Sequence, residues 1–194
     1  MKSQPKKKFA FSSRPKAKEK VASSGVNGNS TNSNTNSSIE LEGIRFLRNE
    51  KIIIESTKSS FEIKGNEGCT IELQALANCL YISGNRNCVI KIGAVRNSVM
   101  IDDCHKCTFE LLTHQLRVHK SKECEFFIFA SSKPIIENCT ELKFAKHRFE
   151  YSGLEEDLKN SGLKDKENLY EQVQDFNWLK TEKSPNFEIV KSSD

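Results

Sequence analysis

Apolar and polar residues alternate in short runs after Ile39, and the runs recur at a nearly constant interval. Four of them begin with a cysteine and place apolar residues two and four positions later: Cys69/Ile71/Leu73, Cys88/Ile90/Ile92, Cys107/Phe109/Leu111 and Cys124/Phe126/Ile128. Their cysteines lie 19, 19 and 17 residues apart. Alternation at every second position is typical of a β-strand with one buried face.

A second, weaker series lies between these runs: Cys79/Tyr81, Ser98/Met100, Leu116/Val118 and Ile135. Each period therefore holds at least two short strands, which predicts stacked coils rather than a helical repeat. In a parallel β-helix no coil can bury its inner face alone, so stacking aligns like side chains into interior ladders. We expect turn residues to mark the corners at Gly65-Asn66, Gly84-Asn85, Arg96-Asn97 and Asn138. The alternative is an antiparallel sandwich with coincidental spacing, which the constant period disfavours.

The pattern predicts one all-β body over residues 39–150, which starts with the apolar runs Ile44–Leu47 and Ile52–Ile54. Residues 151–194 are expected to extend the same domain. A β-helix needs its exposed end or flank covered, and this extension is suited to that task.

Three pieces of the extension have distinct patterns. Residues 153–159 predict a short helix closed by Ser161-Gly162. Residues 168–173 predict a second helical or irregular piece. The aromatic-bearing stretch 175–187 is expected to pack along the coils.

Residues 1–38 differ from the rest in composition. They hold eight Lys and Arg against Glu19 alone, whereas the remaining chain has 22 basic and 25 acidic residues. Residues 1–20 cannot build a core, and residues 23–38, nearly all Ser, Asn, Thr and Gly, predict a flexible linker. The basic tail could bind acidic protein tails, anionic lipid or nucleic acid, the last being the least expected, or could only aid solubility.

We find no targeting signal in the sequence. Lys2 leaves no myristoylation glycine, and no apolar run of 18 residues follows. We therefore expect a protein of the cytoplasm and cytoskeleton without an integral membrane segment. Its seven cysteines, an odd number, then predict reduced, buried small hydrophobes rather than a disulfide framework.

The stretch Thr113–His119 places basic side chains between apolar ones. If Leu116 and Val118 face a core, then Gln115, Arg117 and His119 face solvent as one polar row. This row is the candidate active surface.

These residues, together with the cysteine-bearing coils, resemble the cofactor C-like (C-CAP) domain of tubulin-folding cofactor C and of the retinitis pigmentosa protein that acts on Arf-like GTPases. Further matching groups complete the resemblance over roughly residues 60–190: Pro134–Glu137, Leu142–Phe144, Asp175–Leu179 and Ser184–Asn186. The last two groups look closer to tubulin cofactor C. The resemblance implies a right-handed parallel β-helix.

The resemblance also implies a GTPase-activating protein that presents an arginine finger, and the residue aligned with the finger is Arg117. It would act in trans on β-tubulin held with folding cofactors D and E during heterodimer assembly. No cofactor of its own is implied, because the partner would bind GTP and Mg²⁺. A guanidinium is permanently charged and planar, and such fingers accelerate hydrolysis by about 10³–10⁵-fold.

Four further residues take supporting or partner-binding roles by the same resemblance. Gln115 matches a glutamine that could orient the finger, and Glu137 matches a carboxylate that holds the arginine before the partner arrives. Phe176 matches an aromatic near the docking surface, although it could equally cover the core. His114, with Thr113, stands where the family usually has glutamine preceded by cysteine, a departure that bears on partner choice.

The larger departure lies at the amino terminus, where tubulin cofactor C carries a helical tubulin-contacting domain and this chain has the basic tail. The tail could take over contact with acidic tubulin tails. An Arf-like GTPase is the alternative partner. A non-catalytic cytoskeletal scaffold, as in the related cyclase-associated proteins, is the third reading.

Other chemistries find little support. Cys104 and Cys107 form a Cys-x-x-Cys pair, but no second pair completes a zinc site, so no metal is expected, and no βαβ context favours a redox dithiol. Asp102 and Asp103 are adjacent and should point to opposite faces. No Walker-type loop occurs, so the chain should not bind GTP itself.

Overall fold

A computed structural model describes residues 42–57 and 60–191 of the chain, and the predicted tail and linker, residues 1–38, lie outside these ranges. Within them a single helix, α1 (Leu154–Ser161), accompanies twelve strands. The strands are β1 (Glu42–Arg45), β2 (Lys51–Ile54), β3 (Ser60–Lys64), β4 (Thr70–Leu73), β5 (Ala77–Ser83), β6 (Val89–Asp102), β7 (Thr108–His119), β8 (Glu125–Ala130), β9 (Ile135–Glu137), β10 (Leu142–Lys146), β11 (Gln174–Asp175) and β12 (Phe187–Ile189).

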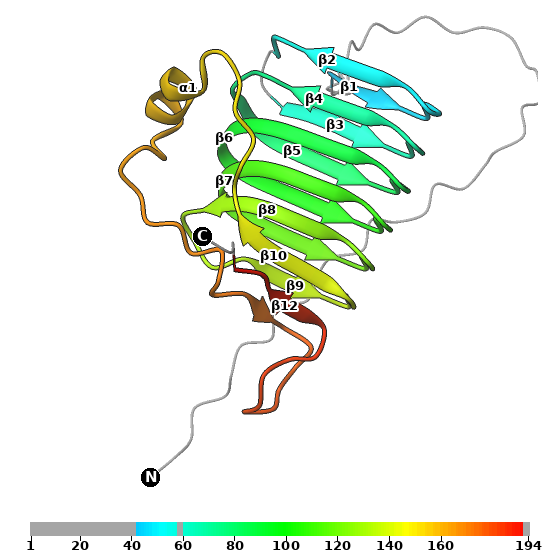
Figure 1. The fold of residues 1–194 in the computed structure, drawn as a ribbon, viewed down its shortest axis with the longest axis vertical. Coiled ribbons are helices and arrows are strands. Elements are labelled where there is room, and N and C mark those ends of the chain that lie inside the picture. Colours follow the sequence, from blue (N-terminus) through cyan, green and yellow to red (C-terminus); the bar gives the residue numbers. More distant parts are fainter. Residues whose placement is uncertain (1–41, 58–59, 192–194) are drawn as a thin grey trace, which may run out of the picture. The chain divides into compact units, whose positions relative to one another are not determined.

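Every paired strand of the body runs parallel to its neighbour, and the strands stack like rungs (Figure 1). One row, named here the Arg117 sheet, runs β1-β3-β5-β6-β7-β9-β11. The second sheet runs β2-β4-β6-β7-β8-β10-β12. Strands β6 and β7 are long enough to bend and belong to both. The predicted parallel β-helix is confirmed, and the sandwich is excluded.

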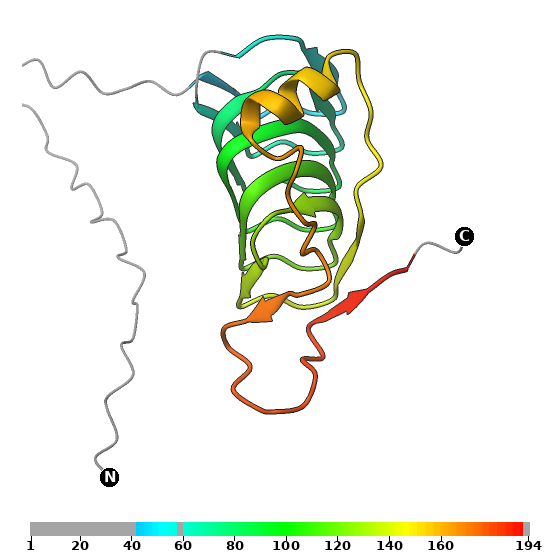
Figure 2. The same ribbon diagram turned by 90° about the vertical axis from the view of Figure 1, so that its left-hand side faces the viewer.

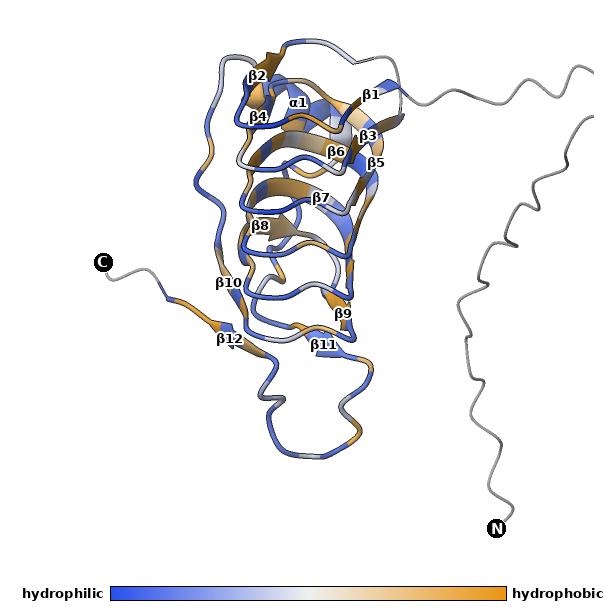
Figure 3. Cartoon of the chain, turned by 90° about the vertical axis from the view of Figure 1, so that its right-hand side faces the viewer, coloured by the Kyte–Doolittle hydropathy of each residue, from blue (hydrophilic) through white to orange (hydrophobic). Residues whose placement is uncertain are grey.

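Each coil passes from the Arg117 sheet to the second sheet through a corner built on left-handed backbone. One residue in the middle of each corner bridges to the next coil, in the order Arg48, Glu67, Arg86, His105, Lys122 and Thr140. Residues with positive φ flank it three apart: Phe46/Asn49, Gly65/Gly68, Gly84/Asn87, Asp103/Lys106, Lys120/Glu123 and Asn138/Glu141. Glycine suits this conformation because it lacks Cβ. The corners are largely hydrophilic (Figure 3).

The corner predictions at Gly65-Asn66, Gly84-Asn85 and Asn138 are therefore confirmed, but the one at Arg96-Asn97 is wrong. Both residues lie inside β6, where the strand continues past them with a shift of register. They are polar because they face solvent, not because the chain turns there.

The core consists of side-chain ladders that cross the coils. One ladder on the second sheet aligns, in register, Ile52, Ile71, Ile90, Phe109, Phe126 and Phe144. The rings of Phe109 and Phe126 stack with centroids 5.1 Å apart, and those of Phe126 and Phe144 with centroids 4.8 Å apart. Stacked rings of this kind add to the free energy gained from burying their area.

Two buried asparagines form a polar ladder inside the corners. The Asn85 side-chain oxygen accepts hydrogen bonds from the backbone and side-chain nitrogens of Asn66, at 3.0 and 2.9 Å. The Asn85 amide nitrogen donates to the carbonyls of Ile63 and Ser83, each at 3.1 Å. A buried amide is stable only when it is bonded in this way.

All seven cysteines are free thiols, and all except the half-buried Cys79 are buried. Their prediction as buried small apolar residues is confirmed for these six and is wrong for Cys79, which lies on the outer side of β5. In the described part of the chain, no helix is both long enough and apolar enough to span a membrane.

After β10 the chain leaves the coils in an excursion, named here the strap, that comprises residues 147–173. It includes α1, which is capped by Gly162 as predicted, and then an irregular piece at residues 168–173. In Figure 2 the strap crosses the faces of successive coils before it reaches β11. Strands β11 and β12 then pair with β9 and β10. The repeat thus resumes at the end of the chain. The predicted packing of residues 175–187 on the coils holds only at the two ends of this stretch, and the residues between them form a largely exposed loop.

The strap is bonded to several coils. Leu163 is buried with Ala94 of β6 and Leu112 of β7 in a small apolar cluster. The Tyr151 hydroxyl donates to Asp157 at 2.6 Å and accepts from the Ala94 backbone at 3.4 Å. Further along, Leu169 donates its backbone hydrogen to the carbonyl of Ala130 in β8, at 2.8 Å.

Candidate functional site

The carboxyl-terminal half of β7 has the alternation that the sequence predicts. Leu116 and Val118 are buried, Gln115 is exposed, and Arg117 and His119 are partly exposed. The polar row therefore lies on the outer surface of the Arg117 sheet. Strand parity fixes this orientation, since a shift of one residue would place Arg117 in the core.

Apolar side chains flank Arg117 on both neighbouring strands. Its register partners are Met100 on β6 and Ile135 on β9, and Tyr81 on β5 lies beyond Met100 in the same row. All three are half-buried. This surface suits the aliphatic stem of an arginine whose charged end stays in water.

In the described ranges Arg117 makes no ion pair and no side-chain hydrogen bond. Its guanidinium thus keeps all its donors for an external acceptor. Sequence reasoning identified the arginine, but it aligned Met100 and Ile135 with the buried Leu116 and Val118. The register instead pairs both with Arg117, on the outer surface of the sheet.

His119, in the same row, is engaged by side chains of the protein itself. Its Nδ1 lies 2.9 Å from an oxygen of Asp102, and its Nε2 lies 3.2 Å from the amide nitrogen of Asn138. The Asn138 amide donates to Nε2, so Nδ1 carries the proton that Asp102 accepts. Asp103 instead pairs with Arg86 at 3.0 Å, so the two adjacent carboxylates do not share a site.

Glu137 lies on β9, which pairs with β7. Its register partner is His119, while Arg117 faces Ile135. Glu137 is therefore diagonal to Arg117 on the same outer surface, about 8 Å away by strand geometry. The described residues include no ion pair between the two. Its role in holding the finger stays a prediction.

His114 points toward the strap. Its Nδ1 lies 2.7 Å from the Ser131 hydroxyl, and its Nε2 lies 2.9 Å from the backbone carbonyl of Ser161 at the end of α1. A carbonyl only accepts, so Nε2 carries the proton. The ring thus anchors the helix, which the sequence did not reveal because Ser161 lies 47 positions away.

Phe176 follows β11, and 54% of its surface is exposed. Its backbone nitrogen bonds to the carbonyl of Ile136, which holds it one strand beyond β9. The next residue, Asn177, accepts a hydrogen bond from the backbone of Asn138 at 2.7 Å. Phe176 therefore stands at the edge of the Arg117 sheet, and its docking role stays a prediction.

One titratable group of this surface has a shifted pKa. Burial, with a contribution from the nearby Asp102 carboxylate, raises the pKa of the Tyr81 phenol. Tyr81 therefore remains a neutral hydrogen-bond donor at physiological pH.

The described residues hold no group of three or more His, Cys, Asp and Glu side chains placed to bind a metal. Cys104 and Cys107 lie in the core, where burial raises the pKa of Cys104 to about 12. A hydrogen bond with Cys124, followed by burial, raises the pKa of Cys107 to about 12.

Strand β6 carries a one-residue bulge beside this surface. Val95 pairs with Thr113 and Ser98 with Gln115, so Arg96 and Asn97 together face His114 alone. An open pocket of about 520 Å³ lies there, lined by Arg96, Asn97, Ser98, His114, Gln115, Ser131 and Ser132. Gln115 thus belongs to both the polar row and the pocket.

Comparison with known proteins places these residues in a family. Residues 58–176 match the family model described as Tubulin binding cofactor C. Tubulin-folding cofactor C of Arabidopsis thaliana is 29% identical over 192 residues, which cover 96% of this chain and 56% of that protein. Tubulin-specific chaperone C of Mus musculus is 32% identical over 123 residues, covering 63% and 36% of the two chains.

Two other similarities are narrower. Protein XRP2 of Mus musculus is 35% identical over 71 residues, 37% of this chain and 20% of that protein. The solved structure of Tubulin Binding Cofactor C from Leishmania major superposes with a TM-score of 0.56 at 22% identity, covering 64% of this chain and 84% of that one. The last likeness concerns the fold alone.

The chain spans little more than half of the Arabidopsis relative and about a third of the mouse chaperone. The family match covers both long strands, the polar row and Phe176. On this ground the chain belongs to the tubulin binding cofactor C family.

Proposed function

We propose that this chain stimulates GTP hydrolysis by β-tubulin in a complex with folding cofactors, with Arg117 acting as an arginine finger. The observation that carries the proposal is the setting of Arg117. It lies on the outer face of β7, between half-buried Met100 and Ile135, with no ion pair in the described residues. Relatives named as a tubulin-folding cofactor and a tubulin-specific chaperone support tubulin as the partner.

The proposed chemistry is electrostatic. As the bond to the γ-phosphate breaks, negative charge moves toward the leaving oxygen, and the guanidinium stabilises it by two directed hydrogen bonds. Met100 and Ile135 would exclude water around the arginine stem at the interface, which strengthens this interaction. GTP and Mg²⁺ would belong to the partner.

Gln115 and Glu137 would assist from either side. Gln115 projects from the same strand and face about 6.6 Å from Arg117, close enough to contact the nucleotide edge or the finger. Glu137 would restrain the guanidinium before docking, and Phe176 would contact the partner at the rim.

The test is single-turnover GTP hydrolysis by tubulin with cofactors D and E, using the wild type, Arg117→Ala, Arg117→Lys and the control Arg48→Ala. We expect Arg117→Ala to lower the stimulated rate by about 10³-fold or more, with binding retained. Arg117→Lys should recover little, because lysine lacks the planar fork. Arg48 lies at a corner away from the Arg117 sheet and pairs only with Glu67 in the described residues, so its loss should be silent.

Equal loss of binding and hydrolysis in Arg117→Ala would assign Arg117 to docking and contradict the finger. A panel of Arf-like GTPases in the same assay tests the second candidate, which is favoured by the resemblance of Gln115–Val118 to both branches of the family. Stimulation of an Arf-like GTPase alone would transfer the proposal to that partner. No stimulation of any GTPase would leave a binding scaffold.

A further inference from the structure

The bulge at Arg96 and Asn97 is one of two register shifts between β6 and β7, and the other lies between Lys91 and Ala94. Opposite β5 the same extra residue occurs, since Ala77 pairs with Val95 and Cys79 with Ser98. Strand β6 thus carries one residue more than either neighbour at this point. The Thr113 hydroxyl shares its one hydrogen between the carbonyls of Asn97, at 3.3 Å, and Gln115, at 3.2 Å, and so joins the two strands at the bulge. Bulges often re-aim a side chain near a functional surface.

The consequence is that Arg96 and Asn97 are both exposed and both line the pocket of about 520 Å³. Arg96 makes no ion pair or side-chain hydrogen bond with any described residue. Of the residues that line the pocket, Arg96 carries a permanent positive charge, and none is acidic. The pocket is therefore positively charged on a body that carries more acidic than basic residues.

The hydrogen-bond donors of the pocket also favour a negatively charged ligand. The Ser132 hydroxyl is spent on the His114 carbonyl at 2.7 Å, and Ser131 bonds the His114 ring. The Arg96 guanidinium and the side-chain amides of Asn97 and Gln115 keep N–H donors without a partner in the described ranges. Three free donor groups, one of them charged, suit an acceptor with negative charge.

We propose that this pocket, built on the bulge of β6, receives an acidic side chain from a loop of the GTPase that Arg117 engages, with Arg96 as its main ligand. The inference rests on the proposed function for the identity of the partner. Arg96 is then a docking and specificity residue, distinct from the finger. Ser98 and Gln115 are register partners, so the pocket adjoins the finger and one partner surface can cover both.

The kinetic test uses Arg96→Ala, Arg96→Glu and a matched charge reversal, Lys51→Glu, on the exposed outer side of β2 in the second sheet. Stimulated hydrolysis is measured against the concentration of each variant. We expect the half-saturating concentration to rise about three- to tenfold for Arg96→Ala and further for Arg96→Glu, because a rim charge acts on association. The rate at saturation should stay at the wild-type value, and Lys51→Glu should be silent.

Wild-type kinetics in both Arg96 variants would overturn the proposal. A lower rate at saturation with an unchanged half-saturating concentration would overturn it as well, since Arg96 would then act on the reaction itself. Direct binding to the GTPase, measured in parallel, separates this inference from the finger. If Arg117→Ala stimulates hydrolysis as well as the wild type does, the proposed function fails. Weaker binding of Arg96→Glu to the GTPase would still support the pocket.

A second experiment identifies the ligand group. Carbodiimide joins amines directly to carboxylates, so the Arg96→Lys variant in complex with the GTPase should cross-link through position 96 to an Asp or Glu of the partner. Arg96→Ala should lack that product. Absence of any cross-link at position 96, when lysines elsewhere react, would contradict an acidic occupant.

Discussion

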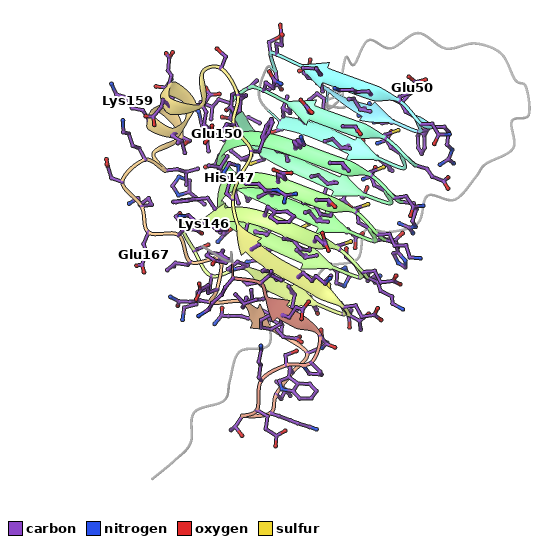
Figure 4. All side chains as sticks on the ribbon, in the orientation of Figure 1. Glu50, Lys146, His147, Glu150, Lys159 and Glu167 are labelled. Atoms are coloured by element: carbon purple, nitrogen blue, oxygen red, sulfur yellow. The ribbon has the colours of Figure 1, made fainter. Side chains whose placement is uncertain are left out.

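Among single residues, His147 has the most unfavourable surroundings for a charge. It lies at the start of the strap, beside β10 (Figure 4), and its buried Nε2 has no hydrogen-bond partner in the described structure. Burial lowers the pKa of His147 to about 4. The folded state therefore holds a neutral imidazole at a position where the unfolded chain takes up a proton near pH 6.5.

The sign of the resulting pH dependence follows. Between pH 6.5 and pH 4 the unfolded state binds more protons than the folded state, so stability falls as the pH is lowered through this window. We expect His147 to account for a loss on the order of 2 kcal/mol. Urea denaturation of the wild type and His147→Leu at pH 8, 6 and 4.5 should show a shallower decline for the variant. Parallel declines would show that His147 is not the cause.

Residue-level prediction from sequence succeeded where strand parity decides and failed where distant contacts decide. The outward direction of Arg117 and the inward direction of Leu116 follow from alternation alone. The partners of His114 do not, because its ring bonds Ser161 across a long excursion of the chain. Asn66 and Asn85 were correctly placed at corners, but their inward hydrogen-bond ladder depends on the stacking of coils.

At the level of elements, one histidine, His114, anchors the C-terminal end of α1. Its N-cap, Gly153, offers no side chain to cap the first turn, and its last residue, Ser161, is held through the carbonyl that His114 bonds. The helix has eight residues, too few to persist without tertiary contacts. The contact at the C-terminal end therefore contributes more to the stability of α1 than the helix propensity of its own residues.

We predict that His114→Ala loosens α1 without unfolding the coils. Amide hydrogen exchange in residues 154–163 should accelerate by about tenfold, because the helix loses roughly one hydrogen bond to a buried partner. The amides of β7 and β8 should keep their protection. His114→Gln, which can donate from its amide, should restore part of the protection. Unchanged exchange in His114→Ala would show that the apolar cluster around Leu163 alone holds the helix.

The elements also show which features of the fold the sequence period can predict. The 19-residue spacing predicted the strands of the body and the interior alignment of cysteines, because stacking demands both. It misassigned Arg96-Asn97, because exposed polar residues mark a bulge and a corner equally well. It missed the return of β11 and β12, since short strands after a long excursion leave no period to detect.

For the whole molecule, the closed interior controls thiol chemistry. Cys79, on the outer surface of β5, is half-buried, and the other six thiols are buried. Burial raises the pKa of Cys104 and Cys139, and the reactive form of a thiol is the thiolate. With Ellman's reagent at pH 8 we expect one fast thiol per chain, which Cys79→Ser removes, and six that react only on unfolding. Several fast thiols would mean that the coils open locally.

The strap has a consequence for cooperativity. A stack of coils is nearly one-dimensional, since each coil contacts only its neighbours, and such a structure can fray from an end one coil at a time. Here Tyr151, Leu163 and Leu169 tie residues after the sixth coil to strands β6, β7 and β8. The strap therefore joins the three middle strands to one another across the stack. These strands cannot separate without breaking the strap contacts as well, so we expect the surface that carries Arg117 to melt as one unit with the strap.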